Sequence, residues 1–223
     1  MPFLAETYHH IIKEVEPLSV TLVAVSKTKP LIDILDAYQF GAKDFGENYV
    51  QELVEKYEAG PKDIRWHFIG HLQSNKVKYI APFVNLIHGV DSEKLLIEIN
   101  KQGKKINRKI NCLLQIHIAQ EETKFGLDEN ELKQIMQHLD QFEYVNVLGL
   151  MGMASFSDDQ EIVMEEFKIL KQIFDTYHHQ DAFKNTFKIL SMGMSADYKI
   201  AIAQGSNMIR IGSSIFGERS KHH

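Results

Sequence analysis

The chain has 223 residues, of which 44% are hydrophobic and 25% charged, and its formal net charge is −5. This length suits one α/β barrel or two smaller domains, and the lack of a basic excess argues against nucleic acid as the main partner. No apolar run approaches the roughly 20 residues that a membrane-spanning helix needs, so no membrane association is expected.

Short apolar runs alternate along the chain with longer amphipathic stretches. Helical periodicity and boundary residues predict helices at residues 3–15, 30–40, 47–59, 74–80, 91–103, 129–139, 159–179 and 195–203. The first helix should end near Glu16-Pro17, because proline disfavours helical geometry in the residue before it. Runs rich in β-branched and aromatic residues predict strands at residues 21–26, 42–46, 66–70, 84–90, 111–118, 145–151, 187–192 and 207–211.

Eight strands separated by helices are typical of a (β/α)8 barrel. The strand at residues 21–26 is apolar on both faces, as a buried parallel strand must be. A doubly wound open sheet is the alternative, but that fold does not require eight units. Because no linker is evident and the chain ends soon after the last strand, we expect residues 1–223 to form a single TIM-type barrel domain, with an extra N-terminal helix and no second domain.

Two glycine- and serine-containing segments follow the last two predicted strands. They are Gly193-Met194-Ser195 and Gly212-Ser213-Ser214. In barrels of this kind, phosphate often binds at these two loops, where small residues let backbone N–H groups approach an anion. Either segment alone would read as an ordinary turn with a capping serine. As a pair at these strand ends, they predict a phosphate site.

Lys27 follows the first predicted strand, and the two-residue period of a strand places it on the same face as Val23 and Val25. It should therefore lie at the mouth of the barrel, where apolar walls would favour the neutral amine. A neutral lysine beside a phosphate site suits Schiff-base formation with a phosphorylated aldehyde. A surface lysine that extends past the strand end is an equally compatible alternative.

Arg210 lies in the last predicted strand, on the face opposite the isoleucines at positions 209 and 211. Because the isoleucines suit packing against outer helices, Arg210 should point into the barrel, where a buried guanidinium needs a partner. That partner is either an inward carboxylate such as Glu47 or the ring nitrogen of a ligand. Since arginine keeps its protons, a ring nitrogen held by it would stay unprotonated, and the ring would be a weaker electron sink.

Six segments spread over nearly the whole chain form an ordered pattern. They are residues 24–30 (AVSKTKP), 45–52 (FGENYVQE), 66–76 (WHFIGHLQSNK), 150–154 (LMGMA), 191–197 (SMGMSAD) and 210–219 (RIGSSIFGER). Together they resemble the YggS/PROSC family of pyridoxal 5'-phosphate (PLP) homeostasis proteins, which is related to the N-terminal barrel domain of alanine racemase. At His71 many relatives carry another residue, which leaves only the detail of that loop open.

The resemblance implies PLP as the cofactor, bound covalently as an aldimine on Lys27. It also implies that Asn48 lies near the cofactor and that Arg210 meets the pyridine nitrogen. A phosphate site is implied at four residues of the last two loops: Met194, Ser195, Gly212 and Ser213.

The function implied is PLP homeostasis, in which the protein holds PLP reversibly without robust catalysis. Its expected partners are PLP and PLP-requiring apoenzymes, and it is expected to be a cytoplasmic monomer or weak dimer. The alternative is a PLP-dependent amino-acid racemase, which needs a base on each face of the substrate. In alanine racemase a tyrosine from a second domain serves one face. A Schiff-base aldolase without PLP would leave Asn48 and Arg210 without a role.

Cys112 is the only cysteine, so no internal disulfide can form and nothing points to an oxidising compartment. Its apolar neighbours predict a small buried side chain. Three pairs of adjacent histidines, at residues 9–10, 178–179 and 222–223, have poor geometry for shared metal ligation and are expected at the solvated surface. No metal site is expected. Four methionines should pack at the barrel mouth or against the cofactor ring: Met151, Met153, Met192 and Met194.

Overall fold

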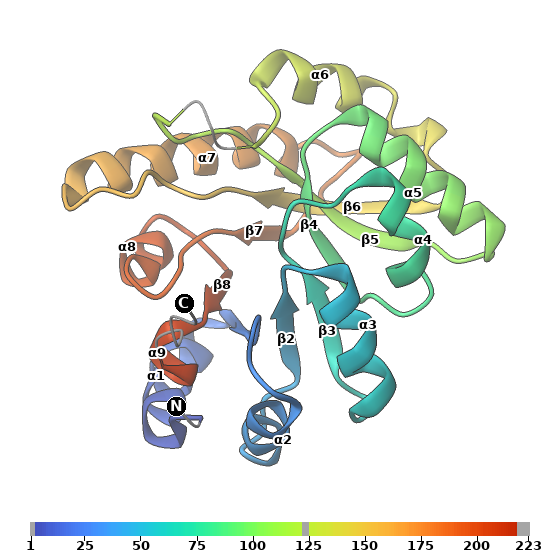
Figure 1. The fold of residues 1–223 in the computed structure, drawn as a ribbon. Helices are drawn as coiled ribbons and strands as arrows, with labels where there is room; N and C mark the ends of the chain where they lie inside the picture. The colour runs from blue at the N-terminus through green and yellow to red at the C-terminus, as the bar shows by residue number, and fades with distance from the viewer. Residues whose placement is uncertain (1–2, 122–124, 218–223) are drawn as a thin grey trace.

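The computed structural model describes residues 3–121 and 125–217. Eight parallel strands form a closed barrel in chain order, and helices surround it (Figure 1). The strands are β1 (Thr21–Val25), β2 (Asp44–Glu47), β3 (Arg65–Phe68), β4 (Leu86–Val90), β5 (Ile110–Gln115), β6 (Val145–Met151), β7 (Ile189–Ser191) and β8 (Met208–Ile211). β1 pairs with β8 and closes the barrel, with Val23 opposite Arg210. The predicted (β/α)8 barrel is therefore confirmed.

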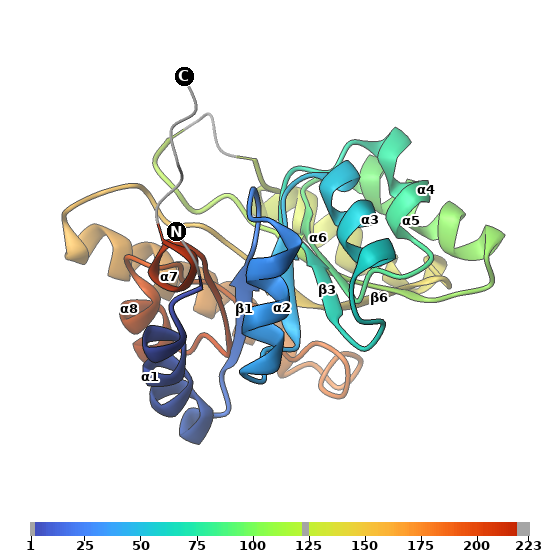
Figure 2. The ribbon, with the colours of Figure 1, turned by 60° about the horizontal axis from the view of Figure 1, so that its bottom comes forward.

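Helices lie between the strands as expected, and Figure 2 shows α2 and α3 outside the barrel wall. The α-helices are α1 (Ala5–Val15), α2 (Leu31–Gln39), α3 (Val50–Ala59), α4 (Val77–Ile80), α5 (Glu93–Lys105), α6 (Glu129–Gln137), α7 (Gln160–His178), α8 (Tyr198–Ala203) and α9 (Ser213–Phe216). Short 3₁₀ helices adjoin three of them: η1 (Glu16–Leu18), η2 (Ser74–Lys76) and η3 (Leu139–Gln141). The start predicted for α8, residue 195, is wrong, because residues 195–197 form a turn.

Side-chain caps explain where two of the helices begin. The Oγ atom of Ser92 accepts a hydrogen bond from the N–H of Leu95 at the start of α5. Asp128 and Glu131 form a reciprocal capping box at the start of α6. Each cap satisfies backbone N–H groups that have no partner within the helix, which typically stabilises a helix by about 1 kcal/mol.

Two hydrophobic clusters lie on opposite sides of the barrel wall. The larger one fills the space between strands and helices and includes Ala24, Ile209 and Ile211. The interior cluster consists of Val23, Leu86, Leu113, Met151 and Met208. Successive residues of β1 and β8 thus alternate between the two clusters, as the two-residue period predicts. Full burial of a side chain of this size stabilises the fold by roughly 1.5–3 kcal/mol, so both faces of these strands contribute.

The extra N-terminal helix α1 packs beside α9, the short helix that follows β8 (Figure 1). The N–H of Leu4 donates to the carbonyl of Ile215 at 2.8 Å, and the rings of Phe3 and Phe216 lie 5.7 Å apart. The sequence predicted α1 but not α9, because four residues after a strand carry too little periodicity to be recognised. These contacts bind the two ends of the described chain to each other.

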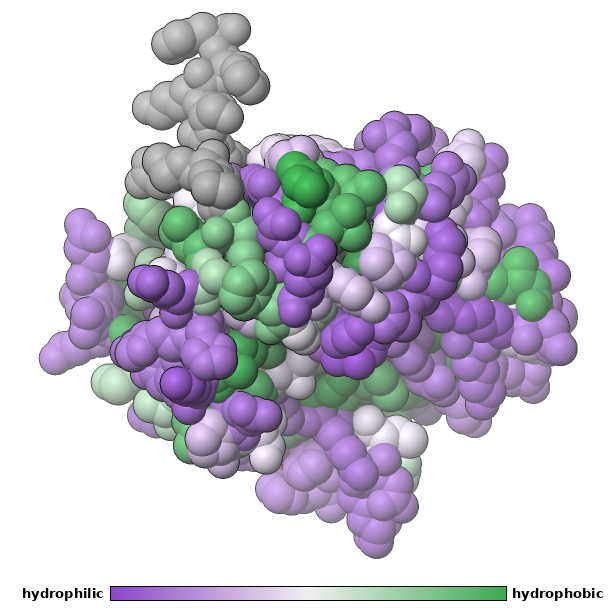
Figure 3. Space-filling model, turned by 90° about the horizontal axis from the view of Figure 1, so that it is seen from below, coloured by the Kyte–Doolittle hydropathy of each residue, from purple (hydrophilic) through white to green (hydrophobic). Residues whose placement is uncertain are grey.

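The face shown in Figure 3 is largely hydrophilic, and hydrophobic residues appear there in separate areas. This distribution is usual for a folded domain whose apolar side chains are mostly inside. None of the helices in the described part of the chain has both the length and the apolar character that a bilayer crossing requires.

Candidate functional site

A cavity of about 690 Å³ lies at the carboxyl ends of the strands. Its volume falls within the roughly 300–1,000 Å³ typical of small-molecule pockets, and active sites of barrels lie at this end. All seven residues predicted for the site line this cavity: Lys27, Asn48, Met194, Ser195, Arg210, Gly212 and Ser213. The fold thus brings together residues that are far apart in the sequence. The roles assigned to them remain predictions.

Lys27 follows β1 and lines the cavity together with Val25, as the alternation along the strand predicts. The next residue, Thr28, adopts a left-handed backbone conformation with φ of 64°, and its N–H donates to Glu52 at 2.6 Å. Lys29 also lines the cavity, but its Nζ donates to the carbonyl of Phe216 at 2.5 Å. Lys29 therefore holds the end of α9, and the tight turn separates it from Lys27.

Glu47 faces away from the barrel interior. Its Oε1 accepts hydrogen bonds from Ser26 Oγ at 2.5 Å and from Lys56 Nζ of α3 at 2.7 Å. Glu47 was one of the two partners that the sequence offered for Arg210, and this alternative is therefore wrong. The register of β2 gives the inner face to Asp44 and the outer face to Glu47. Burial raises the pKa of Glu47 to about 7, although Lys56 and Ser26 act in the opposite direction.

Arg210 points into the barrel, as predicted, and is 4% exposed. Its Nη1 donates to the carbonyl of Ser191 at 2.9 Å and to the Oγ of Ser191 at 2.6 Å, and its Nη2 donates to the carbonyl of Gly152 at 3.0 Å. Burial lowers the pKa of Arg210 to about 10, partly offset by the charge of Asp197. The guanidinium therefore stays protonated at neutral pH and is fixed at the cavity wall as a hydrogen-bond donor.

The loops after β7 and β8 meet at one side of the cavity. The N–H of Gly212 donates to Ser195 Oγ at 3.3 Å, and the N–H of Met194 donates to Asp197 at 2.6 Å. Gly193 has φ of 97°, and a Cβ there would lie 2.6 Å from the Cβ of Ala201, so glycine is required. The small residues gathered in this way leave room for an anionic group beside the two loops, while the N–H groups of Met194 and Gly212 hold the loops themselves in place.

Asn48 lies in the loop after β2 and packs against the loop after β3. A Cβ on Gly70 would lie 2.4 Å from the carbonyl oxygen of Asn48, so this close approach also depends on glycine. The Oδ1 of Asn48 is buried and accepts no hydrogen bond from any residue that the structure describes. Because buried polar atoms normally have partners, this atom is suited to accept a hydrogen bond from a ligand.

A third loop lines the cavity and was missing from the residues predicted for the site. Ser155 anchors this loop, because its N–H and its Oγ each donate to the buried Glu166 carboxylate of α7 at 2.6 Å. Phe156 is 98% exposed beside the cavity. The signal for the loop was present in the segment at residues 150–154, which immediately precedes it. The lining residues of this loop are Met153, Ala154, Ser155, Phe156, Ser157 and Asp158.

The expectations for sulfur-containing residues are confirmed in part. Cys112 is fully buried, and burial raises the pKa of its thiol well above the usual range. Met153 and Met194 line the cavity, whereas Met151 fills the barrel interior. Met192 belongs to the cluster outside the barrel wall, so its predicted place at the mouth is wrong.

The histidine pairs differ in their surroundings. His9 and His10 are exposed, as expected. His178 is only partly exposed, and its Nδ1 hydrogen-bonds to the carbonyl of Phe187 at 2.7 Å, so the expected solvated position is wrong for this residue. Residues 222–223 lie outside the described part of the chain. Among the described residues, no three His, Cys, Asp or Glu side chains are grouped so that they could hold a metal ion.

The model of the alanine racemase N-terminal domain family matches residues 4–220. A pyridoxal phosphate homeostasis protein of Aquifex aeolicus is 40% identical over 199 residues, which cover 89% of this chain and 86% of the relative. PipY of Synechococcus elongatus, solved with PLP bound, is 31% identical with a TM-score of 0.86, covering 96% of this chain and 99% of PipY. Alanine racemase of Bartonella henselae is 14% identical with a TM-score of 0.75, over 93% of this chain and 56% of the racemase, and shows the fold alone.

These comparisons confirm the resemblance inferred from the six segments, and the matched region includes every residue that was predicted for the site. The chain belongs to the family of pyridoxal phosphate homeostasis proteins, whose barrel is that of the alanine racemase N-terminal domain.

Proposed function

We propose that this protein binds PLP reversibly through a Schiff base on Lys27 and serves PLP homeostasis rather than rapid turnover of a substrate. The observation that carries this proposal is a single cavity lined by Lys27, by the paired turns at Ser195 and Gly212, and by the buried guanidinium of Arg210. Family membership supports it, since the Aquifex relative is a pyridoxal phosphate homeostasis protein and PipY was solved with PLP bound.

The residues present fit the chemistry of PLP at each of its functional groups. The turns after β7 and β8 offer backbone N–H groups and the Ser195 hydroxyl for the phosphate. Arg210 offers N–H donors for the ring nitrogen, and the unsatisfied Oδ1 of Asn48 is an acceptor for an O–H group. Met153 and Met194 supply polarisable side chains to the same cavity, which suit contact with an aromatic ring.

Lys27 provides the amine for covalent attachment. In its neutral form, Nζ would form a C=N bond to the aldehyde carbon, and the aldehyde oxygen would leave as water. Water alone reverses this reaction, so covalent attachment is compatible with release. We propose PLP-requiring apoenzymes as recipients. A monomer or weak dimer is sufficient, because residues of one chain form the cavity.

Two features of the cavity argue against a racemase. When bound, PLP supplies an electron sink that weakens if its ring nitrogen is unprotonated, and Arg210 retains its protons at neutral pH. A racemase also needs a second base. The described lining contains no tyrosine, histidine or cysteine. Lys29 and Asp197 are engaged with backbone groups, and the remaining carboxylate, Asp158, is exposed on the loop after β6. A PLP-independent aldolase would have no use for Arg210 at this position.

The test is spectroscopic and chemical. We expect the protein to develop the near-violet absorbance of a Schiff base with PLP, and borohydride reduction followed by mass mapping to place a pyridoxyl group on Lys27. The Lys27→Ala variant should lose both signals, whereas Lys29→Ala should keep the label on Lys27. Retention of the chromophore at equal occupancy in Lys27→Ala would contradict the proposal. Substantial racemisation of any amino acid by the wild-type protein would contradict the homeostasis role.

A further inference from the structure

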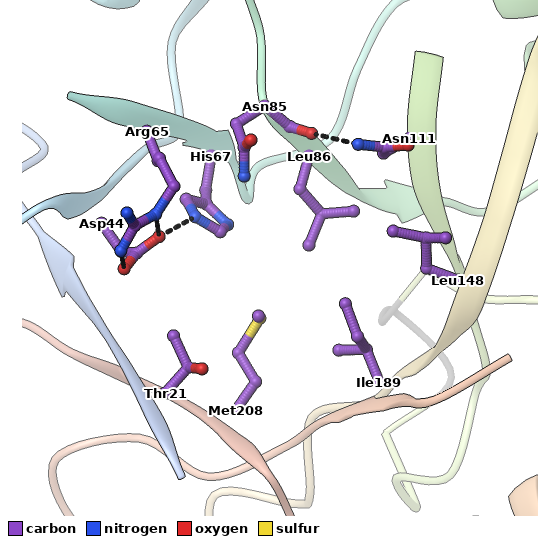
Figure 4. A pocket seen from close by; sticks show the side chains of 10 residues that line it. All are labelled: Thr21, Asp44, Arg65, His67, Asn85, Leu86, Asn111, Leu148, Ile189 and Met208. Carbon is purple, nitrogen blue, oxygen red and sulfur yellow. Dashed lines mark hydrogen bonds and ion pairs between the residues drawn. The ribbon is translucent and has the colours of Figure 1, made fainter. Parts of the chain in front are cut away.

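A second cavity, of about 190 Å³, lies at the opposite end of the barrel, where the strands begin (Figure 4). Residues from the starts of several strands surround it, including Thr21, Arg65 and Met208. Figure 4 shows Asp44 and Arg65 paired at its edge. Arg65 Nε donates to Asp44 Oδ1 at 2.7 Å and its Nη2 donates to Oδ2 at 2.5 Å, while 53% of the Arg65 side chain stays exposed. This bidentate ion pair extends from the barrel interior, at Asp44, to the solvent, at Arg65.

From this ion pair a row of buried polar side chains crosses the barrel. His67 Nε2 lies 3.0 Å from Asp44 Oδ1, and His67 Nδ1 lies 2.9 Å from His88 Nε2. His88 Nδ1 lies 3.1 Å from Ser191 Oγ, which accepts the hydrogen bond of Arg210. The row thus ends at the guanidinium that lines the PLP cavity. We name the following six residues the interior chain: Arg65, Asp44, His67, His88, Ser191 and Arg210.

Only one direction of hydrogen bonding satisfies every member of the interior chain. Asp44 accepts from Arg65, so as a carboxylate it also accepts the Nε2–H of His67. His67 Nδ1 is then an acceptor and receives the Nε2–H of His88, whose own Nδ1 receives the hydroxyl proton of Ser191. In the opposite direction, the Ser191 hydroxyl proton would have no acceptor among its contacts in the described structure.

The ionisation states agree with this direction. Burial is the main cause that lowers the pKa of His88 well below its usual value, so that His88 is neutral. Burial by itself would raise the pKa of Asp44, but hydrogen bonds from His67 and Arg65 outweigh it and lower that pKa. A neutral His88 and an ionised Asp44 are the states that the one-way arrangement requires.

We propose that Asp44, His67, His88 and Ser191 are positioning residues for Arg210, so that an ion pair at one end of the barrel determines how the guanidinium meets the PLP ring nitrogen at the other end. This inference rests on the proposed function. Its physical basis is the hydroxyl of Ser191. While this hydroxyl donates to His88, its lone pairs are available to Arg210. If the chain reversed, Ser191 Oγ would accept from both His88 Nδ1–H and Arg210, and its own hydroxyl proton would have no acceptor among the described contacts.

Two substitutions with matched controls test the proposal. Asp44→Asn removes the charge at the far end of the chain, and Asp63→Asn is its control, because the carboxylate of Asp63 accepts from Lys43 and Tyr38 instead. Ser191→Ala removes the hydroxyl beside Arg210. Its control is Ser206→Ala, which removes a buried hydroxyl that hydrogen-bonds to the backbone carbonyls of Leu190, Met192 and Met208.

The first readout is the ¹⁵N NMR spectrum of histidine-labelled protein without added PLP. In the wild type, we expect His67 and His88 both to carry the proton on Nε2 and to accept at Nδ1. Asp44→Asn should move part of both populations to Nδ1–H, because the carboxylate acceptor is lost, whereas Asp63→Asn should not. A wild-type protein with either histidine protonated at Nδ1 would overturn the assigned direction and with it the proposal.

The second readout is PLP binding by absorbance titration. Ser191→Ala should weaken binding by roughly tenfold and Asp44→Asn by roughly threefold, since hydrogen bonds to charged groups are the strong ones. Both variants should also shift the absorbance maximum of bound PLP, which a purely structural role would not do. Ser191→Thr keeps the hydroxyl and should restore both properties, which separates the hydrogen bond from packing.

The outcomes distinguish this proposal from the proposed function. If the wild type binds PLP and both variants match their controls in affinity and absorbance maximum, the positioning role is overturned while the proposed function stands. If the wild type takes up no PLP at all, the proposed function fails first and the inference fails with it.

Discussion

At the scale of single residues, burial has the largest effect on the pKa of Glu47, which lies behind the candidate site. Its carboxylate lies between β2 and α3, bonded to Ser26 and Lys56, and its Oε2 has no hydrogen-bond partner among the described residues. Desolvation therefore dominates and favours the protonated form. Because Ser26 directly precedes Lys27, this carboxyl also supports the turn that presents the lysine.

Glu47→Gln should change how the free energy of unfolding depends on pH. The folded-state pKa of Glu47 is about 7, above the ordinary value of 4.5, so the folded protein holds the proton more tightly. The stability contributed by the proton is full below pH 4.5 and is lost as the pH rises through 7. Between pH 5 and 8, the free energy of unfolding of the variant should therefore rise by roughly 2–3 kcal/mol relative to that of the wild type, at about 1.4 kcal/mol per pKa unit.

Urea unfolding of the wild type and of Glu47→Gln at pH 5 and at pH 8 measures this change in the free energy of unfolding. Glu58→Gln, at an exposed glutamate of α3, is the control and should show no such gain. Parallel pH profiles for wild type and Glu47→Gln would mean that Glu47 is ionised in the folded protein, as Lys56 alone would favour.

At the scale of elements, the connection from β7 to α8 decides the shape of the predicted phosphate site. Gly193, two residues after the end of β7, has a positive φ, and the N–H of Met194 donates to Asp197, which directly precedes α8. Ser195 then reaches the N–H of Gly212 in the next loop. One left-handed residue thus aligns two loops that are adjacent in space but separated in sequence.

Gly193→Ala should destabilise the protein more than Gly41→Ala. Both glycines have nearly the same φ, 97° and 96°, so each alanine incurs a similar left-handed backbone cost of about 1–2 kcal/mol. A Cβ at residue 41 meets nothing within 4 Å, whereas one at residue 193 meets the Cβ of Ala201 at 2.6 Å. Chemical denaturation should show the additional loss. PLP titration should show weaker binding for Gly193→Ala only. Equal effects at the two positions would contradict this account of the turn.

At the scale of the whole molecule, the barrel interior is apolar at several levels but is crossed by polar side chains. His88 is completely buried at the centre of this row. An ionisable group in such a place ties the stability of the entire barrel to its protonation, because all eight strands enclose it.

Acid should destabilise the barrel through His88. Its folded-state pKa lies below the ordinary 6.5, so the unfolded chain binds the proton first, and the free energy of unfolding falls as the pH drops below about 6.5. Glu47 has the opposite slope over much of this range, so the effect is best measured in a Glu47→Gln background. There we expect a slope of up to about 1.4 kcal/mol per pH unit below pH 6.5.

Adding His88→Gln to this background should flatten the profile, at the cost of lower stability at pH 7.5, whereas His9→Gln at an exposed position should leave it unchanged. Urea unfolding between pH 7.5 and 5 provides the measurement. If the slope is the same with and without His88, its burial does not govern acid sensitivity.

The sequence by itself determined the number and order of the strands and the inner face of β1 and β8. These features follow from local periodicity, because a strand between a packed interior and a layer of helices must be apolar on both sides. The same alternation correctly placed Lys27 and Arg210 toward the cavity. The serine- and glycine-containing turns were recognisable because they follow strands seven and eight.

Only the tertiary structure decided which polar groups meet. It placed Glu47 outside the barrel wall, added the loop at Ser155 to the cavity, and joined His88 to Ser191, which is 103 positions further along the chain. Such contacts depend on the register between strands and on the closure of the barrel by β1 and β8. No local pattern encodes either of these, because each results from packing the whole set of strands at once.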